Sequence, residues 1–206
     1  FPKEMVIEVP ATYNGALLVS SKARKLYAGW GDQEGESERG LWVYDIQSDG
    51  EVTGSDERVY PNSPEPIPPP PPGGGPGHYF RAVGGMLLSP DGKRLYLGVR
   101  GGRHSEKKPL VVYDLDEKGE PKGKPRAYAM GNFHLGISHM LLDPRASILY
   151  TIGWGGTGLF TMPLENGEPA GDPQAYTFGY NAKSSMLPSD RFDCLIFAGQ
   201  PATVEV

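Results

Sequence analysis

Cysteine is nearly absent from this chain, in which Cys194 is the one cysteine among 206 residues. A single cysteine excludes an internal disulfide and does not decide the redox compartment. Because Cys194 stands in an apolar run that ends at Phe197, we interpret it as a buried packing residue. An initiator methionine and a signal-like segment are missing at Phe1. We therefore expect a processed or excised chain of unknown localisation, with a secreted or periplasmic origin favoured.

Clustered positive charge and long apolar runs are also missing. No run of lysine and arginine exceeds two residues, and the formal net charge is −5. A nucleic-acid backbone needs a clustered positive surface, so we exclude a nucleic-acid partner. No apolar run approaches the roughly 20 residues that a membrane-spanning helix needs, so we expect no membrane span.

Catalytic signatures are missing as well. The chain contains no Gly-x-Ser-x-Gly, His-Glu-x-x-His or Walker sequence. His134 and His139 are five residues apart, but no acidic or thiol residues cluster beside them as zinc would require. We therefore expect no metal site and no cofactor, and any function has to come from the arrangement of the fold.

The chain does contain a repeat. Four segments place an aromatic residue ten positions after an apolar one, with a turn between the two. These segments are Leu17–Tyr27, Met86–Tyr96, Met140–Tyr150 and Leu187–Phe197. In the second, the turn Ser89–Gly92 has proline where φ is pre-set and glycine where φ is positive, which predicts a tight hairpin. A helical period is absent, so the repeat predicts pairs of antiparallel strands.

Two further strands follow each pair. The third strands are rich in β-branched and aromatic residues and are predicted over Leu41–Ile46, Leu110–Leu115 and, more weakly, Leu159–Leu164. A turn in which glutamate follows glycine comes next, and Asn166-Gly167 is a strong hairpin signal in the third copy. Polar edge strands are expected around Tyr60, Tyr128 and Tyr176, because prolines and charges flank these tyrosines.

This order of four strands per repeat predicts an all-β fold. It is a β-propeller with four four-stranded antiparallel blades in a single domain over residues 1–206. A Pro/Gly-rich loop insertion is expected at about residues 61–79. We interpret its proline run as a semi-rigid stalk in preference to a partner-binding motif. The predicted strand 5–9 would complete the last blade beside strand 202–206 and close a ring of four. The alternative is part of a larger ring, completed by a missing segment or by a second chain.

The segment Ser89–Gly98, with Val111–Leu115 and Gly119-Glu120 after it, resembles the YVTN and lactonase-type (6-phosphogluconolactonase-like) propeller repeats. The resemblance extends over nearly the whole chain at the level of the repeat. It implies a ring that is usually seven-bladed, so this chain would be a fragment of a larger propeller. It also implies a histidine at the mouth of the central channel, which here is His139, five residues before Pro144. His139 is therefore the candidate catalytic acid or base.

The longest insertions fall in loops that share one face of a propeller, and repeat proteins place variable loops on the face that binds. Aromatic rings combined with arginines suit a sugar, a lactone or a peptide. The alternative is that these side chains pack the blade ends. The candidate ligand-binding residues are Trp30, His78, Tyr79, Arg100, Arg103, His104, His134, Trp154, Tyr180 and Asn181.

Three functions are consistent with these patterns. We favour a non-catalytic recognition propeller that binds a small molecule, a sugar or peptide ligand, or a protein partner through its insertion-rich loop face. The first alternative is a lactone hydrolase or cyclase-like enzyme with His139 at the channel mouth. The second is a structural fragment of a larger propeller protein, whose missing blades carry the activity.

Overall fold

The computed structural model describes residues 15–29, 40–54, 59–61, 81–101, 109–130, 136–143, 145–153, 158–177, 185–188 and 195–198. Every helix or strand in these ranges is a β-strand, so the chain is all-β there. None of the described residues forms a helix long and apolar enough to cross a membrane. The predicted strands 5–9 and 202–206, the insertion at 62–79 and Cys194 lie outside the described residues.

The described strands form antiparallel sheets in chain order. The first sheet runs β1-β2-β3-β4, with β5 also paired to β3. Its strands are β1 (Ala16–Ser20), β2 (Lys25–Gly29), β3 (Leu41–Ile46), β4 (Val52–Thr53) and β5 (Val59–Tyr60). The second sheet has the order β6-β7-β8-β9. Its strands are β6 (Arg81–Leu88), β7 (Arg94–Gly101), β8 (Leu110–Leu115) and β9 (Pro121–Tyr128).

The third sheet repeats this order as β10-β11-β12-β13, with β14 also paired to β12. Its strands are β10 (Ile137–Leu142), β11 (Ile148–Gly153), β12 (Gly158–Glu165), β13 (Glu168–Pro169) and β14 (Gln174–Thr177). A last hairpin joins β15 (Ser185–Pro188) to β16 (Leu195–Ala198). The strands therefore stand where the sequence repeat predicts them, including the three around Tyr60, Tyr128 and Tyr176.

Short side chains close the hairpins between the first and second strands of the sheets. In the second sheet Gly92 N donates to Ser89 O at 2.9 Å, and Asp91 Oδ1 accepts the Ser89 hydroxyl at 2.6 Å. Asp143 has the corresponding role in the third sheet, where its Oδ1 accepts Ser147 N at 2.6 Å. Such side chains satisfy backbone donors that the tight turn leaves without a strand partner.

Apolar side chains fill the space between neighbouring sheets. Tyr27, Leu41 and Val43 of the first sheet pack with residues such as Leu95 and Val111 of the second. On its other face, the second sheet packs against the third through a second apolar cluster. Its buried residues include Tyr96, Leu110, Val112, Ile137, Leu149 and Met162. Each large side chain that is fully buried contributes about 1.5–3 kcal/mol. The second sheet is therefore covered on both faces, which explains why β7 and β8 are almost continuously apolar.

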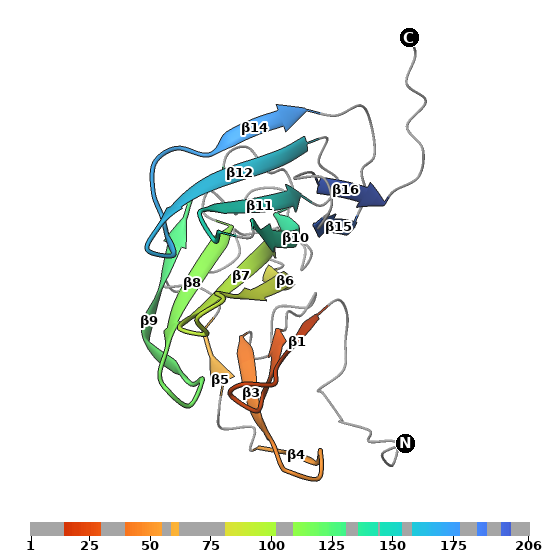
Figure 1. The fold of residues 1–206 in the computed structure, drawn as a ribbon, viewed down its shortest axis with the longest axis vertical. Helices are drawn as coiled ribbons and strands as arrows, with labels where there is room; N and C mark the ends of the chain where they lie inside the picture. The colour runs from red at the N-terminus through yellow and green to blue at the C-terminus, as the bar shows by residue number, and fades with distance from the viewer. Residues whose placement is uncertain are drawn as a thin grey trace, which may run out of the picture.

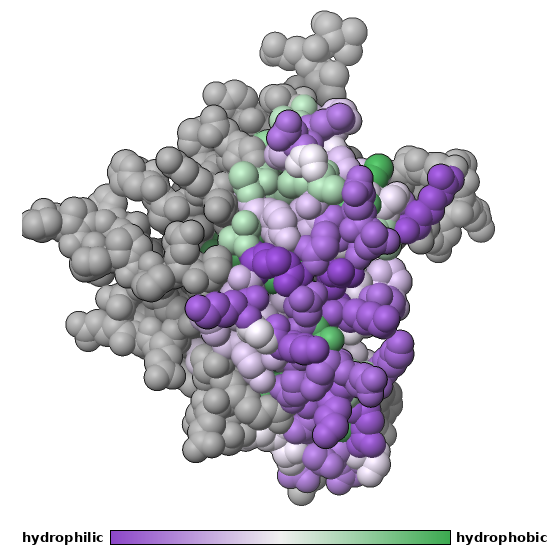
Figure 2. All heavy atoms as spheres, turned by 90° about the vertical axis from the view of Figure 1, so that its left-hand side faces the viewer, coloured by the Kyte–Doolittle hydropathy of each residue, from purple (hydrophilic) through white to green (hydrophobic). Residues whose placement is uncertain are grey.

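The sheets share one inner side. β6 contacts both β1 and β10, and β10 contacts β15. Figure 1 shows these first strands gathered on one concave side, with β9 and β14 on the outside. The described residues on the outward surface are mostly hydrophilic (Figure 2), as outer edge strands require. This is a propeller-like arrangement of antiparallel sheets around a common inner side.

Candidate functional site

A β-bulge near the start of β10 shapes the candidate site. Ile137 pairs with Gly153 and His139 with Ile152, so Ser138 is an extra residue in the strand. β6 has a corresponding bulge between Val83 and Gly85. A bulge redirects the side chains beside it and is common next to functional sites. The bulge in β10 therefore sets the direction of Ser138 and His139 on the inner side of the fold.

The two bulged strands touch at this point. A Cβ atom added to Gly85 would lie 3.0 Å from the Ser138 carbonyl oxygen and 3.6 Å from the His139 Cα. A side chain on β6 would thus push against the backbone that carries the histidine. The absence of a side chain at position 85 is what allows β6 and β10 to approach so closely.

Hydrogen bonds fix the form of the His139 ring. The Ser138 hydroxyl donates to Ile152 O at 3.1 Å, and the Ser138 oxygen lies 3.1 Å from His139 Nδ1. Because that hydroxyl uses its proton on the carbonyl, its oxygen accepts from Nδ1–H of the histidine. The neutral ring then carries its proton on Nδ1, and Nε2 has a free lone pair. We assign this tautomer from the hydrogen-bond pattern.

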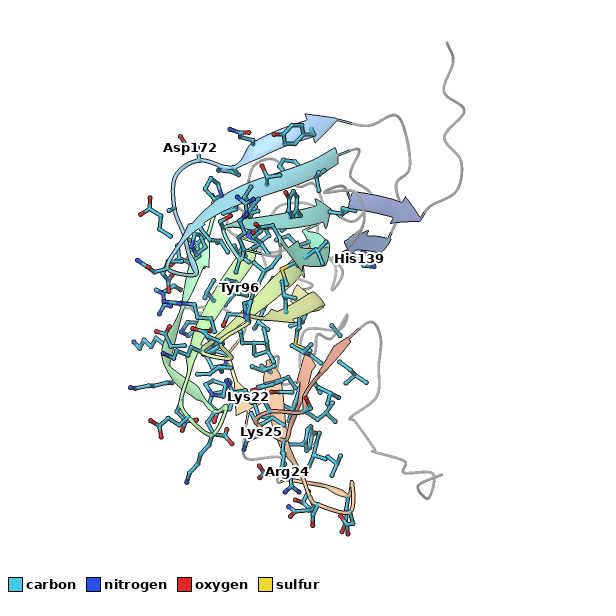
Figure 3. All side chains as sticks on the ribbon, viewed as in Figure 1. Lys22, Arg24, Lys25, Tyr96, His139 and Asp172 are labelled. Atoms are coloured by element: carbon cyan, nitrogen blue, oxygen red, sulfur yellow. The ribbon has the colours of Figure 1, made fainter. Side chains whose placement is uncertain are left out.

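Partial burial favours the neutral ring of His139 over the charged one. Burial of the ring by the surrounding chain lowers the pKa of His139 from its usual 6.5. The side chain nevertheless remains exposed to solvent. Figure 3 places His139 beside β10 on the inner side of the sheets. The arrangement therefore offers a ligand a neutral imidazole that can accept a hydrogen bond or a proton.

Most of the predicted ligand-binding residues lie outside the described residues. These are Trp30, His78, Tyr79, Arg103, His104, His134, Trp154, Tyr180 and Asn181. Arg100 lies in β7, which continues to Gly101, and its backbone pairs with Ala82 of β6. Among the described residues, no group of three or more His, Cys, Asp or Glu side chains gathers as a metal site. Ser138 was not anticipated, because a bulge has no distinct sequence pattern.

Sequence reasoning also missed a charged contact that joins the first sheet to the second. The Lys25 side chain, 7% exposed, forms ion pairs with Asp45 at 2.6 Å and with Glu120 of the second sheet. The Tyr27 hydroxyl donates to Gly119 O at 2.8 Å, and Tyr60 donates to Glu120 at 3.0 Å. Burial and the nearby Glu120 carboxylate raise the pKa of Tyr27, which keeps its hydroxyl a donor.

The second and third sheets are joined in the same way. Arg94 Nε donates to Glu168 Oε1 at 2.9 Å, and the Tyr96 hydroxyl donates to Gly167 O at 2.6 Å. Tyr128 donates to Glu168 Oε2 at 2.7 Å. Burial raises the pKa of Tyr96 to about 12. We call this repeated set of contacts a clasp. In each clasp, a cation and a tyrosine of one sheet bind the Gly-Glu turn of the next sheet.

Arg126 strengthens the second clasp. Its guanidinium donates to both oxygens of Asp114, at 2.8 and 3.0 Å, and to Glu168 Oε1 at 2.6 Å. The hydrogen bonds from Arg126 lower the pKa of Asp114. A planar guanidinium that binds two carboxylates in this way fixes their relative position more firmly than a point charge does.

Open grooves run beside the two clasps. A groove of about 750 Å³ lies between the turns of the first and second sheets, and one of about 480 Å³ between those of the second and third. The first is bordered by Lys22, Lys93 and Lys118, but also by Asp91 and Asp116. Charges of both signs alternate along it and do not converge on a single point. We therefore assign the candidate site to the bulge of β10 and not to these grooves.

Comparisons with known proteins support the fold but no activity. No family model matches the chain, and no curated protein matches it. Its fold is similar to that of a protein from Lactobacillus plantarum whose crystal structure is known, with a TM-score of 0.58 at 16% sequence identity. The match covers 87% of this chain and 46% of that protein, so the chain spans less than half of its length. At this identity the likeness concerns the fold alone.

Proposed function

We propose that this chain is a recognition propeller that binds a small polar ligand on the inner side of its sheets, next to His139. The observation that carries the proposal is the hydrogen bond from His139 Nδ1 to Ser138, which leaves Nε2 free to accept. A fixed, neutral acceptor suits a hydroxyl or amide donor of a sugar, a lactone or a peptide.

The strand directions support a binding face at this end of the sheets. In antiparallel neighbours, β2, β7 and β11 end where β1, β6 and β10 begin. The connections that leave those strand ends contain Trp30, Arg103, His104 and Trp154. In the sequence, four of the residues predicted to bind a ligand thus follow strands that end beside the start of β1, β6 or β10, which supports the proposal.

Ligand-observed NMR with a panel of monosaccharides and small lactones tests this proposal. We expect binding by the wild-type chain, a loss of at least about tenfold in affinity for His139→Ala, and partial retention for His139→Gln. Asp172→Asn is the matched control, because Asp172 is exposed and lies on the opposite, outer side of the molecule (Figure 3). Equal binding by wild type and His139→Ala would refute the site.

A second candidate is a lactone hydrolase or cyclase-like enzyme that uses the same histidine. Its support is the resemblance of the repeats to lactonase-type propellers, together with the free Nε2 of a neutral imidazole, which is what a general base needs. If the chain is an enzyme, His139→Gln should abolish lactone turnover and leave lactone binding measurable. Binding without turnover in the wild type favours the recognition propeller.

We further propose that the sheets are blades of a propeller of the lactonase type. The described strands would then be three blades and the first hairpin of a fourth, within a ring that has more blades. The coverage of less than half of a longer protein with the same fold supports this assignment. A closed ring of four is the alternative.

A further inference from the structure

The turn between β12 and β13 carries a chemistry that the proposed ligand site does not use. The chain contains two Asn-Gly pairs, Asn14-Gly15 and Asn166-Gly167. The second pair closes a two-residue hairpin, because Glu165 pairs with Glu168 across it. The φ values of Asn166 and Gly167 are +52° and +77°. Such a pair of left-handed residues is typical of a type I′ turn, which asparagine and glycine tolerate.

The groups that react when an asparagine deamidates are accessible in this turn. Asn166 is exposed and borders the groove of about 480 Å³ beside the second clasp, so water reaches its side chain. Within the described part of the chain, the Gly167 amide donates no hydrogen bond. Glycine also has no side chain that would hinder the approach of its nitrogen to the neighbouring side chain. The nucleophile and the carbon that it attacks are therefore not protected by burial.

The reaction is an intramolecular acyl transfer in which water is the co-reactant. The Gly167 nitrogen attacks Cγ of Asn166 and gives up its proton, the bond from Cγ to Nδ2 breaks, and Nδ2 leaves as ammonia. Water then opens the succinimide ring at one of its two carbonyls. Attack of water at Cγ gives aspartate. Attack at the former main-chain carbonyl gives isoaspartate, in which the main chain runs through Cγ and is longer by one carbon.

The second clasp opposes this reaction. Ring closure requires the peptide unit between Asn166 and Gly167 to rotate toward the asparagine side chain, and this rotation displaces the glycine. The Gly167 carbonyl accepts the Tyr96 hydroxyl at 2.6 Å, and Glu168 Oε1 accepts Arg94 Nε at 2.9 Å. These contacts have to open before the ring can form. The rate of deamidation therefore depends on a local opening of the contact between the second and third sheets.

We propose that Asn166 is a deamidation site which the second clasp protects, and that its conversion to isoaspartate releases the turn from the second sheet. The additional main-chain carbon moves the Gly167 carbonyl and Glu168 away from the positions at which Tyr96 and Arg94 bind them. A transient opening between two sheets is thereby made permanent by a covalent change. This inference goes beyond the proposed ligand site and is independent of binding beside His139.

Peptide mapping by mass spectrometry, during incubation of the folded chain at mildly alkaline pH, tests the protection. Tyr96→Phe keeps the buried ring and removes the hydroxyl, so it should raise the deamidation rate at Asn166 by about threefold to tenfold. The rate at Asn14, which belongs to neither clasp, should not change. Tyr27→Phe is the matched control, because it removes the corresponding hydroxyl from the first clasp. An equal effect of both variants at Asn166, or no effect of Tyr96→Phe, would overturn the proposal.

The wild-type chain provides a second test that does not depend on the folding of a variant. Deamidation at Asn166 should be at least about tenfold slower in the folded chain than in the chain unfolded by guanidinium. Equal rates in the two states would show that the clasp gives no protection.

The effect of the product is measured on chains separated after incubation. The isoaspartate form should melt several degrees below the unmodified chain, whereas Asn166→Asp, which adds the charge without the additional carbon, should melt close to it. An isoaspartate form that melts with the unmodified chain would overturn the proposed release of the turn.

Discussion

At the scale of single residues, Thr151 is the clearest local defect. Its hydroxyl is fully buried on β11, and it has no hydrogen-bond partner among the residues that the structure describes. A hydroxyl that is removed from water without a partner costs about 1–3 kcal/mol. The methyl group and backbone of Thr151 fit the strand, where it stands opposite Met140 and Phe160.

Replacement of this threonine by valine, which has nearly the same shape, should therefore stabilise the fold. We expect Thr151→Val to raise the free energy of unfolding by about 1 kcal/mol, measured by urea denaturation. Thr161→Val is the control, because Thr161 is only partly buried on β12. A loss of stability in Thr151→Val would mean that the hydroxyl has a partner, such as a bound water.

His139 allows a test that needs no ligand. Nitrogen-15 NMR of the imidazole should show the neutral ring with its proton on Nδ1 at pH 7, because Ser138 accepts from that atom. The pKa should lie below 6.5, since burial disfavours the charged ring. Ser138→Ala should shift the ring toward the other tautomer. A predominant Nε2–H form in the wild type would contradict the site.

Glu168 should make stability depend on pH. Burial raises the pKa of its carboxyl, but hydrogen bonds from Tyr128, Arg126 and Arg94 outweigh burial and lower it. A carboxyl whose pKa is lower in the folded state stabilises fully above its unfolded pKa, and this contribution is lost as pH falls through the folded pKa. The stability difference between wild type and Glu168→Gln should therefore shrink below about pH 4.5. A difference that is constant from pH 7 to pH 2 would argue against the contact.

At the scale of elements, the Gly-Glu turns combine two separate requirements. All three need a positive φ, which costs a residue with a side chain about 1–2 kcal/mol. Gly119 and Gly167 also lie against the tyrosine of the preceding sheet, whereas Gly50 does not. The same substitution in the three turns therefore separates the conformational cost from the steric cost.

We expect Gly50→Ala to destabilise the chain by about 1 kcal/mol, through the backbone alone. Gly119→Ala should cost at least about 1 kcal/mol more, because the new methyl group would overlap Ala23 and the Tyr27 hydroxyl. Chemical denaturation of the two variants side by side measures the difference. Equal losses would mean that the turn of the second sheet is not held against the first sheet.

Much of the element level was predictable from the sequence. Alternating apolar residues and Pro-Asp-Gly or Asn-Gly turns define the strands locally, and β2, β7 and β11 lie where the repeat predicts them. The contacts between sheets were not predicted, since Gly119-Glu120 was interpreted only as a turn. A signal was present, because a cation stands two residues before the tyrosine in Lys25-Leu26-Tyr27 and in Arg94-Leu95-Tyr96. Its meaning depends on which sheets are neighbours, and the sequence alone does not show that.

At the scale of the whole molecule, one arrangement of contacts is used between successive sheets. The first and second sheets, and then the second and third, are joined by an apolar core and by a clasp at the outer turn. Hydrophobic packing supplies most of the stability, and the clasp fixes the relative position of the sheets. The third sheet has Ile148 at the position of the cation, so it lacks the cation of a clasp. The first sheet, in contrast, has a Gly-Glu turn like those that form the clasps.

The most direct test of this arrangement compares three acids that share one position in the repeat. Urea denaturation at pH 7 should show that Glu120→Gln and Glu168→Gln each lower the free energy of unfolding by about 1–2 kcal/mol, because the largely buried Lys25 or Arg94 loses one of its two carboxylate partners. Glu51→Gln should change it by less than about 0.5 kcal/mol, as expected for an exposed side chain. Equal losses at all three positions, or no loss at Glu120 and Glu168, would contradict this account, in which clasps form at Glu120 and Glu168 but not at Glu51.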